Sequence, residues 1–217
     1  MDRQRQIELF SLSRLASYKD WREHSANLAL IADISIRLGL LEIITRNKVA
    51  LLLGIDDSEF ISKQTLGYWC KCIDTNRLHN RLVNMRNMDF RKYSTHNKKD
   101  KMRDYQKVQI AYSILRTIRN RAFHFENLLK TNTNGTPRLS SVCEFGKTRI
   151  LVGIDGDRIA EFLDDFLGCF DSELKEYTQE VKYLMLAKKQ KRKIAKVAAW
   201  WRNVACGGRW WRCRWWR

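Results

Sequence analysis

The chain has 217 residues, of which 44% are hydrophobic, and its formal net charge is +17. This hydrophobic share predicts a folded core and excludes a chain that is disordered throughout. No run of uncharged apolar residues is long enough for a transmembrane helix, and the N-terminus lacks the apolar centre of a signal peptide, so we expect a cytoplasmic protein. A single proline and ten glycines favour a mostly helical fold.

The positive charge is concentrated at the C-terminal end. Residues 188–217 hold eleven Lys and Arg and no Asp or Glu, and removing these charges from +17 leaves +6 for residues 1–187. The six cysteines are scattered and form no C-x-x-C pair, so we expect neither a disulfide framework nor a metal site, and no cofactor. We therefore divide the chain into a helical domain, residues 1–187, and a basic tail, residues 188–217.

The first half of the chain carries helical patterns of apolar residues. They predict helices at residues 2–18, 22–53, about 60–72 and about 76–89. Gly54 follows the long second pattern and is a natural C-terminal stop. The segment Tyr93–Asp100 is polar and predicts a loop, and a long helix is then expected from Lys101 to Lys130.

The remainder predicts a hairpin followed by further helix. Residues 131–137 are rich in Thr and Asn and contain Gly and Pro, which breaks the preceding helix. Residues 138–145 and 148–154 then flank Gly146-Lys147 and predict a small β-hairpin. Asp155 or Asp157 is expected to cap the next helix, and residues 174–187 continue helically. The fold class that follows is all-α, a helical bundle with a small β-hairpin insertion.

Three residues on the long helix at 101–130 carry the chemistry, namely Arg119, Asn120 and His124. On a helical wheel the apolar residues, including Ile118 and Phe125, form one stripe, and Asn120, His124 and Asn127 lie with other polar residues on the opposite side. An arginine can stabilise a charged phosphorane, and a histidine can move a proton near neutral pH. These groups are the minimum needed to cut RNA without a metal ion. A solvated polar face is the structural alternative.

The geometry of one helix separates Arg119 from His124 by roughly 140°. One helix alone would therefore not direct both side chains at one phosphate, whereas two copies about a two-fold axis can contribute both pairs to a shared cleft. We therefore expect a homodimer. The same spacing recurs at Arg91 and His96 in the polar segment, where we interpret it as chance.

Four segments together resemble a known family. The run Arg119–Glu126 resembles the R-N-R-x-x-H-x-E pattern of Abi-like abortive-infection proteins, a branch of the HEPN superfamily. Residues 40–47 are similar to the family's L-x-E-x-x-x-R-N helix, and residues 66–69 to its G-[FY]-W segment. The hairpin followed by residues 162–166 also fits. The four segments occur in the family's order and cover roughly residues 20–170.

The resemblance implies a HEPN helical bundle, commonly dimeric, with clefts that act as metal-independent ribonuclease sites. Arg119 and His124 match the catalytic pair, and Asn120 matches the polar position after the arginine. Supporting or substrate-binding residues are Arg116, Arg121, Glu126, Glu42, Arg46 and Asn47. Glu42 and Arg46 are four residues apart, so either a surface ion pair or support of the site explains them equally well.

The tail pairs tryptophan with arginine. Six of the eight tryptophans lie in residues 188–217, and each tryptophan pair adjoins an arginine. Such a segment can enter an anionic membrane interface or stack on nucleic-acid bases, or it can be an extension without selected function.

The leading functional hypothesis is an endoribonuclease toxin or phage-defence effector that acts on RNA and can be paired with an antitoxin. The alternative is a non-catalytic HEPN module that binds RNA or a nucleotide. A third hypothesis is a membrane-active protein that acts through its tail. Deletion of residues 188–217 separates the third hypothesis from the first two.

Overall fold

The computed structural model describes residues 1–98, 102–145, 148–185, 187, 195 and 196. The chain divides into two compact units, Met1–Lys175 and Glu176–Arg217. Nearly all of the basic tail lies outside the described residues, as do Gly146 and Lys147.

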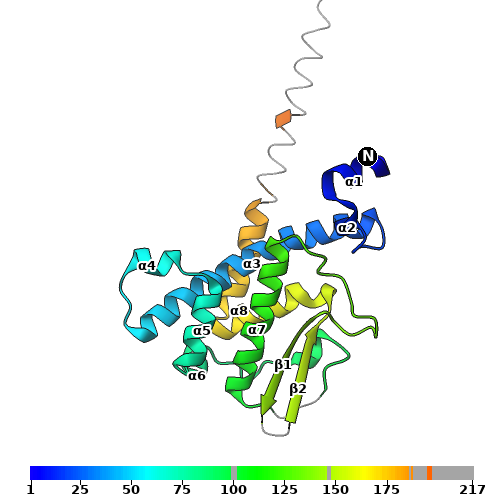
Figure 1. The fold of residues 1–217 in the computed structure, drawn as a ribbon. Helices are drawn as coiled ribbons and strands as arrows, with labels where there is room; N and C mark the ends of the chain where they lie inside the picture. Colours follow the sequence, from blue (N-terminus) through cyan, green and yellow to red (C-terminus); the bar gives the residue numbers. More distant parts are fainter. Residues whose placement is uncertain (99–101, 146–147, 186, 188–194, 197–217) are drawn as a thin grey trace, which may run out of the picture. The chain divides into compact units, whose positions relative to one another are not determined.

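The protein is mostly helical and carries one small two-stranded antiparallel sheet, as the sequence predicted (Figure 1). In chain order the elements are α1 (Arg3–Phe10), α2 (Leu12–Leu15), α3 (Trp21–Leu53), α4 (Ser58–Lys63), α5 (Leu66–Thr75), α6 (His79–Leu82), η1 (Phe90–Tyr93), α7 (Asp104–Phe123), β1 (Leu139–Phe145), β2 (Thr148–Ile154), η2 (Gly156–Arg158) and α8 (Ile159–Phe170). Residues 173–185 are also helical, which agrees with the helix predicted from residue 174.

Helix α3 runs the length of the first unit, with α1 and α2 near one end and α4 near the other (Figure 1). The Asp20 side chain caps its start by accepting a hydrogen bond from the Glu23 N–H at 2.8 Å. Gly54 ends it in the left-handed conformation, with φ 67°, which glycine adopts without steric cost. These local signals confirm the helix predicted at residues 22–53.

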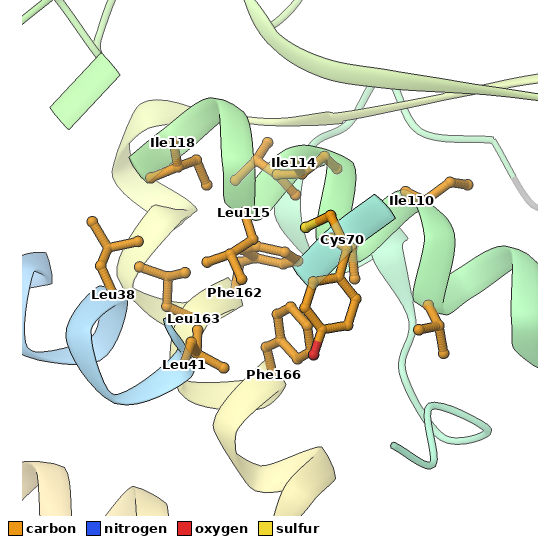
Figure 2. Packing of buried hydrophobic residues seen from close by; sticks show 14 of the residues in the cluster. Leu38, Leu41, Cys70, Ile110, Ile114, Leu115, Ile118, Phe162, Leu163 and Phe166 are labelled. Carbon is orange, nitrogen blue, oxygen red and sulfur yellow. The ribbon is translucent and has the colours of Figure 1, made fainter. Parts of the chain in front are cut away.

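The core lies where α3, α7 and α8 pack together. Figure 2 shows Leu38 and Leu41 of α3 facing Ile118 and Leu115 of α7, with side chains of α8 between them. Ile118 is fully buried, as its place on the apolar stripe of the wheel predicted. A buried ion pair joins α3 to α8 beside this core, with Arg37 Nε 2.7 Å from Asp164 Oδ1.

Several predicted boundaries were wrong. The helix predicted at residues 2–18 is broken at Ser11, whose φ of 64° interrupts the helical path between α1 and α2. The helices predicted at 60–72 and 76–89 are instead the short helices α4, α5 and α6. Neither Asp155 nor Asp157 caps α8 with its side chain, since the 3-10 turn η2 separates Asp155 from the helix and contains Asp157.

The hairpin prediction is confirmed, and its register pairs Leu139 with Ile154. Strand β1 packs against α7. Asn97 holds β2 from the preceding loop, because its side chain donates to the Gly153 carbonyl and accepts from the Gly153 N–H, both at 2.8 Å. The hairpin is thereby fixed beside the helix that carries Arg119.

Among the described residues, no helix has both the length and the apolar character needed to cross a lipid bilayer.

Candidate functional site

Helix α7 ends at Phe123, well before the predicted end at Lys130. The Glu126 N–H donates to the Arg121 carbonyl at 2.9 Å and the Phe125 N–H to the Ala122 carbonyl at 3.0 Å, which is the Schellman pattern of helix termination. Phe125 takes the left-handed position of this motif with φ 53°, where glycine is usual. His124 is therefore the C-terminal cap of the helix, and the helical wheel does not apply to the residues that follow it.

The wheel also misplaced residues after this point. Phe125 was assigned to the apolar stripe but is half exposed, and Asn127 was assigned to the polar face but is buried. Both errors have one cause, because residues 124–128 form a turn in which helical periodicity no longer applies. We call residues 124–128 the motif turn.

Asn27 of α3 is the principal anchor of the motif turn. Its fully buried side chain donates to the Glu126 carbonyl at 3.0 Å and accepts from the Leu128 N–H at 2.8 Å. It also donates to the Tyr18 hydroxyl at 3.1 Å. One amide thus satisfies two backbone groups of the turn that a continued helix would have paired internally.

Two further side chains lock the turn from either side. Arg14 Nη1 donates to the carbonyls of His124 at 3.2 Å and Phe125 at 2.8 Å. Asn127 donates to the Ser17 carbonyl at 2.7 Å and accepts from the Leu129 N–H at 2.9 Å. The backbone beneath His124 is therefore held by residues near the N-terminus, about a hundred positions earlier in the chain.

Glu42 joins two of the sequence motifs, residues 40–47 and residues 119–126. Its carboxylate contacts Arg119 Nε at 3.2 Å and Arg46 Nη2 at 3.4 Å, so one acidic group of α3 joins its own helix to α7. Arg119 Nη1 also donates to Asn120 Oδ1 at 3.4 Å. These four residues form the Glu42 cluster. The contact to Arg119 goes beyond the surface ion pair with Arg46 that the spacing alone explained.

Arg119 is held on several sides within this cluster. Its guanidinium lies over the Phe123 ring, with 5.3 Å from Cζ to the ring centroid. Among the described residues no hydrogen bond from Nη2 is found, so this nitrogen can donate to an incoming oxygen. Phe123 is half exposed, so the guanidinium rests on an aromatic face at the surface.

His124 is exposed, and the hydrogen bonds found for it involve its backbone. Its N–H donates to the Asn120 carbonyl at 3.0 Å, the last helical bond before the turn. The imidazole is therefore accessible while the backbone that carries it is fixed. This combination suits a group that exchanges protons with a bound substrate.

The other predicted supporting residues lie at separate places in the fold. Arg121 approaches Glu126 at 3.8 Å, next to the motif turn. Asn47 is exposed, and no contact brings it into the Glu42 cluster within the part of the chain described. Arg116 is exposed as well and lines a separate cavity.

That separate cavity has a volume of about 190 Å³, and it lies between α5, α7 and β1. Asp74 and His79 face it and are joined at 3.0 Å from Oδ1 to Nε2. Cys70 also lines it, but burial raises the pKa of this thiol to about 12, so it stays protonated at neutral pH and is no nucleophile. The cavity supplies polar groups next to Arg116 without an activated nucleophile.

Within the described ranges, no three His, Cys, Asp or Glu side chains are arranged to hold a metal ion.

Sequence reasoning missed Asn27, Arg14 and the role of Asn127. Asn27 interrupts the apolar pattern of α3, and a polar residue at a core position requires a partner. That signal was present in the sequence, but the identity of the partner depends on how α3 and the motif turn meet in space.

No family model, curated protein or solved structure matches this chain.

Proposed function

We propose that the protein is a metal-independent endoribonuclease of the HEPN type, a toxin or abortive-infection effector in antiviral defence, with Arg119, Asn120 and His124 as its catalytic residues. The observation that carries the proposal is the pairing of a clamped arginine with an accessible histidine. Glu42 holds Arg119 beside Asn120, and five residues on, His124 is exposed on a backbone locked by Arg14. The family resemblance of the sequence supports the same assignment.

In the proposed reaction the 2′-hydroxyl of the RNA attacks the adjacent phosphorus. The 2′-oxygen loses its proton as the new P–O bond forms, and the departing 5′-oxygen takes up a proton as its bond to phosphorus breaks. His124 serves as general base or general acid in these transfers. The products are a 2′,3′-cyclic phosphate and a 5′-hydroxyl, and because the nucleophile is internal to the RNA, no metal ion is needed to activate water.

Arg119 would stabilise the negative charge that develops on the phosphorane oxygens. Glu42 contacts Nε of the guanidinium, so Nη2 remains for a phosphate oxygen. Asn120 would orient Arg119 through its amide oxygen, or contact the phosphate with its amide nitrogen. Preorganisation of this kind matters because the donors need no rearrangement when the charge appears.

The experiment is cleavage of single-stranded RNA by purified protein in the presence of EDTA. We expect cleavage to persist in EDTA and to fail on RNA whose 2′-hydroxyls are replaced by hydrogen. His124→Ala should lower the rate by about 10²–10⁴-fold, as expected for loss of general acid–base catalysis. The matched control is His96→Ala, which removes another exposed histidine that also follows an arginine at the same spacing.

Equal cleavage by wild type and His124→Ala, or cleavage only after magnesium is added, would exclude this mechanism. Binding of RNA without any cleavage would favour the non-catalytic module instead.

A further inference from the structure

A second cavity lies beside the motif turn, with a volume of about 290 Å³. Helix α2 and its flanking residues contribute Ser11, Ser13, Arg14 and Ser17, and the other wall includes Glu126 and Arg138. We call this cavity the basic pocket. Apart from Glu126, these residues offer hydroxyl and guanidinium donors, which suit an anionic ligand.

Positive charge in this region exceeds the negative charge available to balance it. Glu126 lies 3.8 Å from Arg121, and Arg138 has no carboxylate within ion-pair distance among the described residues. Arg14 uses Nη1 on backbone carbonyls. Three guanidinium groups at or next to the pocket therefore share one carboxylate.

Arg121 shows the consequence of this imbalance. Burial lowers its pKa, the positive charge of Arg138 lowers it further, and Glu126 opposes both effects only in part. Its Nη1 atom is buried and has no hydrogen-bond partner. An anion bound in the pocket next to Arg138 would reduce the repulsion between the guanidinium groups of Arg138 and Arg121.

The basic pocket lies directly beside the motif turn. Arg14 lines the pocket, and the same guanidinium donates to the carbonyls of His124 and Phe125. An anion bound in the pocket would therefore lie next to the turn that presents the His124 imidazole. The RNA backbone carries a phosphate between each pair of nucleotides, so further phosphates flank the one that is cut.

We propose that the basic pocket binds a backbone phosphate of the RNA substrate next to the scissile one. This inference rests on the proposed function for the identity of the ligand. The pocket would fix the strand relative to His124 without reading the base, because guanidinium and hydroxyl groups contact phosphate in any sequence. Arg138 is the best residue for a test, since Arg14 also supports the motif turn.

The test is binding of a single-stranded RNA octamer with 2′-O-methyl groups at every position, which cannot be cleaved by the proposed reaction. Fluorescence anisotropy over a range of salt concentrations compares wild type with Arg138→Gln. We expect the variant to bind about tenfold more weakly. The decrease of log affinity with log salt concentration should also become less steep, by about 1 in the slope. The control is Arg149→Gln, which removes the same charge from an exposed residue of β2 outside the pocket.

A second variant keeps the test independent of any folding defect in Arg138→Gln. Ser13→Glu places a carboxylate at an exposed position of the pocket and should weaken binding similarly, while Ser58→Glu on α4 should not. Equal binding by Arg138→Gln and Arg149→Gln would overturn the proposal, as would absence of RNA binding by the wild type. Tight binding of inorganic phosphate that RNA does not displace would assign the pocket to a free anion instead.

The two proposals fail in distinguishable ways. Binding that depends on Arg138, without cleavage of natural RNA, would contradict the nuclease and retain the phosphate pocket. Cleavage that depends on His124, with binding indifferent to Arg138, would contradict only the pocket.

Discussion

Glu42 is the residue on which the arrangement of the candidate site depends most. It is half-buried between two guanidinium groups, at 3.2 Å from Arg119 and 3.4 Å from Arg46. Without its negative charge the two arginines would repel each other across a short distance. In the proposed reaction Glu42 is thus a positioning residue that acts through Arg119.

We expect Glu42→Gln to lower kcat for RNA cleavage by roughly 10- to 100-fold, because small misplacements of a catalytic group have effects of this size. The KM should change less, and the free energy of unfolding should fall by about 1 kcal/mol or less, as for other partly exposed ion pairs. The control is Glu59→Gln, which breaks the exposed pair with Lys63 on α4. Full activity in Glu42→Gln would show that Arg119 needs no such support.

At the scale of elements, the N-terminal helices are joined to α3 by a cluster of rings around His24. The imidazole is buried and stacks on Trp21, with ring centroids 4.8 Å apart, while Phe10 and Tyr18 meet it edge-on. Burial lowers the pKa of His24, and the nearby positive charge of Arg14 lowers it further. The folded protein therefore favours the neutral imidazole.

This joint makes stability depend on pH. Because the pKa of His24 is lower in the folded state than its ordinary value of about 6.5, its contribution is present above that pH and is lost as the pH falls below it. We expect the urea midpoint of the wild type to drop between pH 7.5 and pH 5.5 by more than that of His24→Phe, which keeps a ring in the cluster. Equal drops in the two proteins would contradict this, and His96→Ala controls for an exposed histidine.

The ring cluster around His24 is also connected to the candidate site. Arg14 and Tyr18, which face His24, also contact the backbone of the motif turn, Arg14 at 2.8 Å from the Phe125 carbonyl. The end of α7 is thus held by elements that the sequence places far away from it.

For the whole molecule, the expected homodimer stays a prediction. Arg119 and His124 are separated by the last turn of α7 and are anchored by different partners, Glu42 and Arg14. A cleft shared by two copies would supply both residues to one phosphate. Two half-exposed apolar residues lie on the surface at the Glu42 cluster, namely Phe123, whose ring contacts Arg119, and Ile43, which follows Glu42 in the sequence.

Mixing of inactive variants tests the shared cleft. Arg119→Ala and His124→Ala protomers, unfolded together and refolded, should regain about a quarter of the wild-type activity per chain if half of the dimers are mixed and each has one intact cleft. Mixed Arg119→Ala and Asn120→Ala chains should regain no activity, since Asn120 accepts a hydrogen bond from Arg119 of its own chain and both would enter the same cleft. A protein that is monomeric by solution scattering and still cleaves RNA at the full rate would rule out the shared cleft.

Elements with strong local signals could be predicted from the amino-acid sequence. One apolar pattern ending at Gly54 predicted nearly the whole of α3, and two short strands around Gly146-Lys147 predicted the hairpin. Arg119, Asn120 and His124 could be selected because they are close together in the chain. Helix caps depend on hydrogen bonds over three to five positions, and a hairpin on the turn between two adjacent strands, so neighbouring residues suffice to predict them.

The end of α7 and the residues that support the candidate site depend on contacts that form only in the folded protein. Asn27 terminates the helical path by taking backbone groups of Glu126 and Leu128, about a hundred residues away in the chain. Glu42 reaches Arg119 across 77 positions in the same way. These contacts depend on the packing of α3 against α7, and because a buried polar group needs only some partner, its own sequence neighbourhood does not specify which one.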